Sequence, residues 1–123
     1  MSETLRQKQE RFTLDVSRLV VRLAEMGVRA RYREVLRTPE QAQRNADKGL
    51  GISNSLHIDG LAADLYLSVR DEPLAETPAA YAVMGELWKS MGVDHRWGGD
   101  FRDRRGRPKP DIYHVSIAHG GRK

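Results

Sequence analysis

The chain has 123 residues, the length of one ordinary domain, and contains no cysteine. The missing thiols exclude disulfide scaffolds, thiol catalysis and thiolate metal sites, so any metal would be held by nitrogen and oxygen. The net charge of +4 is compatible with a polyanionic partner, but it is also an ordinary charge for solubility. No apolar run reaches the roughly 20 residues of a membrane helix, and the N-terminal segment does not resemble a signal peptide.

The first half of the chain predicts two helices and a strand. Apolar residues recur every three or four positions and predict an N-terminal helix over residues 1–27. We expect its basic face to be solvated, because acidic residues dilute the positive charge: Glu3, Glu10, Asp15 and Glu25. Alternation over residues 28–36 predicts a strand. Thr38 and Pro39 predict the start of a second helix, which is followed by a Gly-, Ser- and Asn-rich loop over residues 48–61.

The second half predicts two strands around a core helix. Alternation predicts a half-buried strand over residues 64–69, and a Thr-Pro cap begins a core helix over residues 77–92. A Gly- and Arg-rich loop over residues 97–110 leads to a final strand over residues 112–117. We expect residues 118–123 to form a flexible tail. Helices and strands in this order predict a single α+β domain.

Two separated pairs of polar residues have the chemistry of a metal site. His57 lies in a polar loop, Asp64 opens a strand seven residues later, and Gly60 permits a sharp turn between them. Asp111 and His114 form the second pair. Imidazoles and carboxylates suit zinc where thiolates are missing. The spacing alone leaves two interpretations open, a metal site or an ordinary loop histidine with a turn-forming aspartate.

Four ordered motifs resemble one group of enzymes. Residues 55–64 read S-x-H-x-x-G-x-A-x-D, and the acid at Asp111 stands three residues before a histidine. Residues 37–41, 61–65 and 97–101 are similar to the family's R-[ST]-x-x-Q, G-L-A-x-D-L and W-G-G-D-[FW] segments. The motifs resemble the zinc peptidases that cut the peptide stems of peptidoglycan. That group includes VanY-like D-alanyl-D-alanine carboxypeptidases and bacteriophage L-alanyl-D-glutamate endopeptidases, and it shares its fold with the hedgehog signalling domain.

The resemblance implies a fold and a metal centre. Residues 1–123 would form a single catalytic domain, in which helices, including the N-terminal one, pack against a small antiparallel sheet of the hedgehog or D,D-peptidase type. One Zn²⁺ per chain would be held by His57, Asp64 and His114. A fourth position would remain open for water, as in catalytic zinc sites.

Asp111 falls where the family places its general base. Much of the family has glutamate there, and aspartate occurs in part of the phage branch, so the shorter side chain must approach the water more closely. Residues three apart in a straight strand point to opposite faces, so Asp111 and His114 could not both line the site from one strand. Pro110 resolves this, because it makes Asp111 a loop residue that is free to turn inward. His114 and Ser116 would then share one strand face.

Further residues are assigned by the same resemblance. Arg37 is similar to the family arginine that steadies the substrate carbonyl and the developing oxyanion; the alternative is an ordinary charge before a helix. Ser55 would position substrate or orient its loop. Trp97 and Asp100 would shape the substrate cleft; Trp97 could equally be core, and Asp100 is a candidate partner for a ligand imidazole.

Other polar residues have weaker assignments. We expect His95 to be a surface group, with substrate contact as the alternative. We expect His119 to lie in the flexible tail. The basic loop over residues 102–109 could attract anionic envelope polymers, or it could simply be solvated.

The resemblance predicts a monomeric zinc endopeptidase, an endolysin that cleaves the L-alanyl-D-glutamate bond with Asp111 as general base. It would wait in the host bacterial cytoplasm and reach the wall after the inner membrane is permeabilised. The nearest alternative is a D-alanyl-D-alanine carboxypeptidase, which would normally need an export signal. A non-enzymatic basic module for wall polymers or nucleic acid is a further alternative. The presence of all three ligands and of the general base argues against such a module: His57, Asp64, His114 and Asp111. We therefore expect no nucleic-acid partner.

Overall fold

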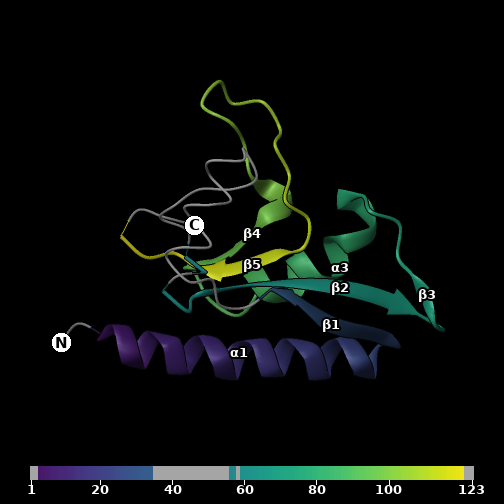
Figure 1. Cartoon of the computed structure of the whole chain (residues 1–123), viewed down its shortest axis with the longest axis horizontal. Helices are drawn as coiled ribbons and strands as arrows, with labels where there is room; N and C mark the ends of the chain where they lie inside the picture. Colours follow the sequence, from purple (N-terminus) through teal and green to yellow (C-terminus); the bar gives the residue numbers. More distant parts are fainter. Residues whose placement is uncertain (1–2, 35–55, 58, 121–123) are drawn as a thin grey trace.

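The computed structural model describes residues 3–34, 56–57 and 59–120 (Figure 1). The elements, in chain order, are α1 (Leu5–Glu25), β1 (Val28–Glu34), β2 (Ala62–Val69), β3 (Glu72–Pro73), α3 (Pro78–Lys89), β4 (His95–Trp97), a 3₁₀ turn η1 (Gly98–Asp100) and β5 (His114–Ile117). In the described part of the chain, two helices pack against an antiparallel sheet, which confirms the predicted α+β fold. The helix predicted from Thr38, and the predicted loop up to residue 55, lie outside the described residues.

The sheet has the strand order β1-β2-β5-β4, and the short β3 pairs with the far end of β2. All of these pairings are antiparallel. The last strand of the chain is therefore inserted between β2 and β4. In the β2 and β5 pairing, Asp64 lies directly opposite His114, and Ala62 lies opposite Ser116. The topology thus brings together two residues that are far apart in sequence.

Helix α3 begins where the sequence predicts, whereas α1 begins at Leu5, later than the predicted residue 1. The Thr4 hydroxyl accepts a hydrogen bond from the Gln7 N–H and completes a capping box, and Thr77 caps α3 with Pro78 in its first turn. The first helix ends before Gly27, whose φ of 83° suits glycine. Helix α3 ends at Lys89, earlier than the predicted residue 92.

The core lies on one face of β2, and polar residues lie on the other. Leu65 and Leu67 are fully buried, whereas Tyr66 and Ser68, which alternate with them, are half-buried. Phe12 of α1 and Trp88 of α3 meet edge to face with ring centroids 5.7 Å apart, so the two helices share this core. Figure 1 shows α1 running along the sheet, with the loop between β4 and β5 projecting away from it.

The strands differ from the predictions in their bounds and in their number, and β2 begins at Ala62 instead of residue 64. The final strand begins at His114 instead of residue 112, because residues 112–113 form a turn in which the His114 N–H donates to the Asp111 carbonyl at 3.2 Å. The short strands β3 and β4 were not predicted. Among the described residues, no helix is long and apolar enough to cross a membrane.

Part of the predicted C-terminal tail contacts α1. The Lys8 ammonium donates to the Ala118 carbonyl at 3.2 Å and lies 3.2 Å from the Nδ1 of His119. The Ala118 N–H in turn donates to the Asp94 carbonyl at 2.9 Å. Residues 121–123 lie outside the described residues.

Candidate metal centre

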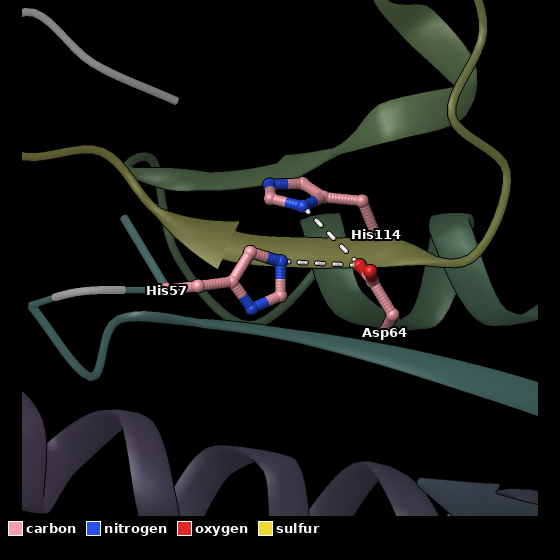
Figure 2. Close-up of side chains that lie close together, drawn as sticks. All are labelled: His57, Asp64 and His114. Atoms are coloured by element: carbon pink, nitrogen blue, oxygen red, sulfur yellow. Dashed lines mark ion pairs between the residues drawn. The ribbon is translucent and has the colours of Figure 1, made fainter. Parts of the chain in front are cut away.

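Three buried side chains converge beside the sheet. One ligand atom from each of His57, Asp64 and His114 lies within 4.8 Å of the others. The Nε2 of His57 and the Nδ1 of His114 are each 3.4 Å from the same Asp64 oxygen, Oδ1. Figure 2 shows both imidazoles pointing at this carboxylate. The structure therefore brings together the three residues that the family resemblance assigns as metal ligands.

Local backbone structure explains how the three residues meet. Asp64 and His114 occupy opposite positions on β2 and β5. His57 comes from a turn in which the Leu61 N–H donates to the Leu56 carbonyl at 3.0 Å, and Gly60 takes the left-handed φ of 69°. The sharp turn expected at Gly60 is confirmed. Helix α1 contacts this turn, because the Gln9 side-chain amide donates a hydrogen bond to the Asp59 carbonyl at 2.6 Å.

The geometry of this cluster fits zinc. Zinc binds nitrogen and oxygen ligands at about 2.1 Å in a tetrahedral arrangement, which places neighbouring ligand atoms about 3.4 Å apart. Both distances from Asp64 Oδ1 to the imidazole nitrogens have this value, 3.4 Å. Oδ1 is also a buried oxygen that has no hydrogen-bond partner in the described part of the chain. An unsatisfied buried oxygen is costly, and a cation held between the three side chains would remove that cost.

The Asp64 carboxylate is strongly biased toward its ionised form. Burial alone would raise its pKa, but the imidazoles of His114 and His57 favour the negative charge and lower the pKa well below its usual range. Its second oxygen, Oδ2, lies 3.5 Å from Nη1 of Arg33. The carboxylate can therefore accept a cation without first losing a proton.

Asp111 lies in the loop before β5, as expected from Pro110. Its N–H donates to the Gly98 carbonyl at 2.8 Å. A Cβ on Gly98 would overlap the Asp111 carbonyl, so glycine permits this close approach. Asp111 as a whole is exposed, but its carboxyl group is partly shielded from water. This burial raises the pKa of the carboxyl, and the negative charge of Asp64 raises it further. The charges of His114, Arg33 and His57 oppose this shift.

The two predicted cleft residues make contacts away from the cluster. Trp97 is 5% exposed and belongs to the core, and its indole N–H donates to the Ile112 carbonyl at 2.9 Å. These contacts correspond to the core interpretation of Trp97 and fix the turn before His114. Asp100 forms an ion pair with Lys89 at 2.7 Å. Arg37 and Ser55 lie outside the described residues.

The expectation that His95 is a surface group is wrong. Its side chain is buried, with Nε2 at 2.8 Å from Asp15 Oδ2 and Nδ1 at 3.1 Å from Asp94 Oδ1. The interpretation of Asp15 as a solvated charge is also wrong, because it is 7% exposed. The position of Asp15 on the apolar stripe, beside Phe12 and Val16, was the signal that could have revealed a buried polar pair.

Arg33 is a residue near the cluster that the sequence analysis missed. Its Nε donates to the Tyr66 hydroxyl at 3.0 Å, in addition to the contact with Asp64. Burial lowers its pKa, but the interactions with Tyr66 and the negative charges of Asp64 and Asp111 raise it overall. An irregularity in the pairing register between Tyr32 and Glu34 accompanies this placement.

Comparison with known proteins places the fold. No protein-family description and no curated protein sequence matches the chain. Among solved structures, it is similar to the L-Ala D-Glu endopeptidase ChiX of Serratia marcescens, with a TM-score of 0.61 and 20% identity over 85% of this chain and 77% of ChiX. It is also similar to the vancomycin resistance D,D-pentapeptidase VanY, solved in complex with Zn(II), with a TM-score of 0.59 and 17% identity over 87% of this chain and 70% of VanY. The chain therefore has the fold of these two peptidases, which confirms the expected D,D-peptidase-like architecture.

Proposed function

We propose that this chain is a zinc-dependent peptidoglycan endopeptidase that hydrolyses the L-alanyl-D-glutamate bond of stem peptides. The observation that carries the proposal is the buried cluster of His57, Asp64 and His114, with its zinc-like spacing and its unsatisfied oxygen. The fold supports it, because one structural neighbour is an L-Ala D-Glu endopeptidase and another binds Zn(II).

In this proposal one Zn²⁺ per chain is held by the two imidazoles and the carboxylate. When bound, zinc lowers the pKa of a coordinated water to about 7 and polarises a substrate carbonyl. The protein contributes an ionised carboxylate at Asp64 and two imidazoles that His57 and His114 supply as neutral ligands. Burial of all three side chains limits competition from bulk water.

Asp111 is the proposed general base. Its carboxyl belongs to the loop that leads directly into His114. The raised pKa makes it a better proton acceptor than an ordinary aspartate, provided that the carboxyl remains ionised at the working pH. It would take a proton from the attacking water and return it to the leaving amine.

Other sequence assignments complete the proposal. Arg37 would stabilise the developing oxyanion, and Ser55 would position substrate. We propose that Trp97 acts through the turn that it fixes, and that Asp100 shapes the cleft rim. In this proposal the enzyme is a monomeric endolysin that acts on the wall from the host cytoplasm after the inner membrane is permeabilised. The basic loop over residues 102–109 would favour approach to an anionic envelope.

The nearest alternative is D-alanyl-D-alanine carboxypeptidase activity, which the similarity to VanY favours. The two activities release different products from purified sacculi. Mass spectrometry of the digest should show stem peptides detached between alanine and glutamate. Release of free D-alanine with intact stems would overturn the endopeptidase assignment and support the alternative.

A further inference from the structure

A second polar site lies along the sheet from the metal cluster. An open pocket of about 490 Å³ is lined by residues of β2 and β3. Figure 1 shows that β3 lies at the far end of β2 from β4. Its lining includes Arg31 of β1, Tyr66 and Ser68 of β2, and Glu76 and Tyr81 near the start of α3. No residue assigned to the metal centre or to its chemistry lines this pocket, so its lining residues are not part of the proposed catalytic machinery.

The pocket is continuous with the metal cluster through one face of the sheet. Asp64, Tyr66 and Ser68 alternate along β2, so their side chains project from the same face. Arg33 spans the gap, because its guanidinium contacts Tyr66 at 3.0 Å and Asp64 at 3.5 Å. Two strand residues span about 7 Å, so the near wall of the pocket is about two extended peptide residues from Asp64.

The two sides of the pocket carry opposite charges. The Arg31 guanidinium stacks 4.5 Å from the centroid of the Tyr66 ring, and neither it nor Glu76 forms an ion pair with any described residue. Burial of Tyr113 and its contact with the nearby Glu76 carboxylate raise the pKa of the phenol. A stacked guanidinium is suited to a carboxylate, and an exposed carboxylate is suited to an ammonium group.

Two aromatic side chains, Tyr66 and Tyr81, line the pocket together with these charged groups. Tyr66 and Tyr113 meet edge to face at 5.2 Å, and Tyr113 and Tyr81 do so at 5.3 Å. Tyr81 is also fixed, because its hydroxyl accepts the Leu67 N–H at 3.0 Å. The pocket thus offers a cation, an anion and rigid aromatic walls. A short aliphatic chain that ends in both a carboxylate and an amine matches all three.

We propose that this pocket binds the third residue of the stem peptide when that residue is a diamino-dicarboxylic acid. Its terminal carboxylate would contact Arg31 and its amine would contact Glu76. The inference rests on the proposed function, because cleavage between alanine and glutamate places the third residue two positions beyond the bond, within the part of the stem that leaves with the new amine. A stem with lysine at this position would supply the amine but no carboxylate.

The test uses the full zinc-loaded chain and two synthetic tripeptides, L-alanyl-D-γ-glutamyl-diaminopimelate and its lysine counterpart. The wild type should cleave the first with a kcat/KM about tenfold higher, as expected for one charge-assisted hydrogen-bonded contact. Arg31→Gln should bring the ratio of the two kcat/KM values close to one. Arg29→Gln is the matched control, because Arg29 is an exposed arginine on the same strand that does not line the pocket.

Two outcomes would overturn the inference: equal cleavage of both peptides by the wild type, or an unchanged ratio in Arg31→Gln. Calorimetric binding of D-γ-glutamyl-diaminopimelate separates this inference from the proposed function. If no peptide bond is cleaved, the proposed function fails. A dissociation constant about tenfold higher in Arg31→Gln than in Arg29→Gln would still support the pocket, whereas equal constants would contradict it.

Discussion

Asp64 on β2 and His114 on β5 lie directly opposite each other, with Asp64 Oδ1 3.4 Å from His114 Nδ1. The same oxygen lies 3.4 Å from His57 Nε2 and has no hydrogen bond from a described residue. The pairing of two strands, together with one glycine turn, therefore builds a buried negative centre. Burial of this negative charge costs folding free energy unless a cation occupies the site.

Removal of zinc should destabilise the protein. A ligand that binds only the folded state stabilises it by about 4 kcal/mol at a thousand times its dissociation constant. We expect chelation to lower the thermal midpoint of the wild type by several degrees, measured by circular dichroism. His57→Ala should show little dependence on the chelator. Equal midpoints for the wild type with and without chelator would argue against a metal at this cluster.

Acid should destabilise the metal-free chain through Asp64. The pKa of this carboxyl is depressed in the folded state, so the unfolded chain binds more protons as the pH falls below about 4. The stabilisation that the ionised Asp64 carboxylate provides is complete above the pKa that this group has in the unfolded chain. It is lost as the pH falls through the lower pKa of the folded chain. Urea denaturation of the apo protein as a function of pH should show a shallower acid dependence for Asp64→Asn. The same dependence in both proteins would refute this linkage.

Gly98→Ala should disturb the position of Asp111. A Cβ at this position would overlap the Asp111 carbonyl and crowd the Cβ of His114. We expect a loss of about 1 to 3 kcal/mol in the free energy of unfolding, as in other overpacked sites, with loss of peptidase activity. Gly106→Ala is the control. The positive φ of Gly106 penalises alanine through the backbone, but nothing lies within 4 Å of the added Cβ. Equal activity in the two variants would contradict a positioning role for Gly98.

The buried pair of Asp15 and His95 should contribute to stability without affecting the metal. Truncation of His95 to alanine leaves a buried carboxylate without its imidazole partner, so we expect a loss of about 3 kcal/mol in the free energy of unfolding. Zinc content should remain at the wild-type level. A double-mutant cycle with Asp15→Asn measures the coupling between the two side chains. Additive effects in that cycle would show that the pair contributes nothing as a unit.

The sequence predicted local structure better than contacts between distant residues. The cap at Thr77, the stop at Gly27 and the alternation along β2 all depend on neighbouring residues, and the structure confirms them. The turn at Gly60 was predictable for the same reason. The apolar stripe of α1 could have revealed that Asp15 is buried, but not that its partner is His95, because the two positions are 80 residues apart.

Two other features depend on the whole sheet. Strand β4 has only three residues, too few to show alternation, and it exists because β5 pairs with it. The approach of Arg33 to Asp64 occurs beside an irregular register between β1 and β2, which the sequence of one strand does not show. The metal cluster itself was predicted because its motifs resemble a known family, whereas its depth of burial was not.

The most direct test of the account compares zinc content and release of L-alanyl-D-glutamate cleavage products in the wild type, His57→Ala and Asp111→Asn. The account predicts about one zinc per chain in the wild type and in Asp111→Asn, and loss of zinc in His57→Ala. Activity should fall by at least about a hundredfold in both variants, because His57→Ala loses the metal and Asp111→Asn removes the general base. Wild-type cleavage by both variants, or by the fully chelated protein, would contradict a zinc peptidase at this site.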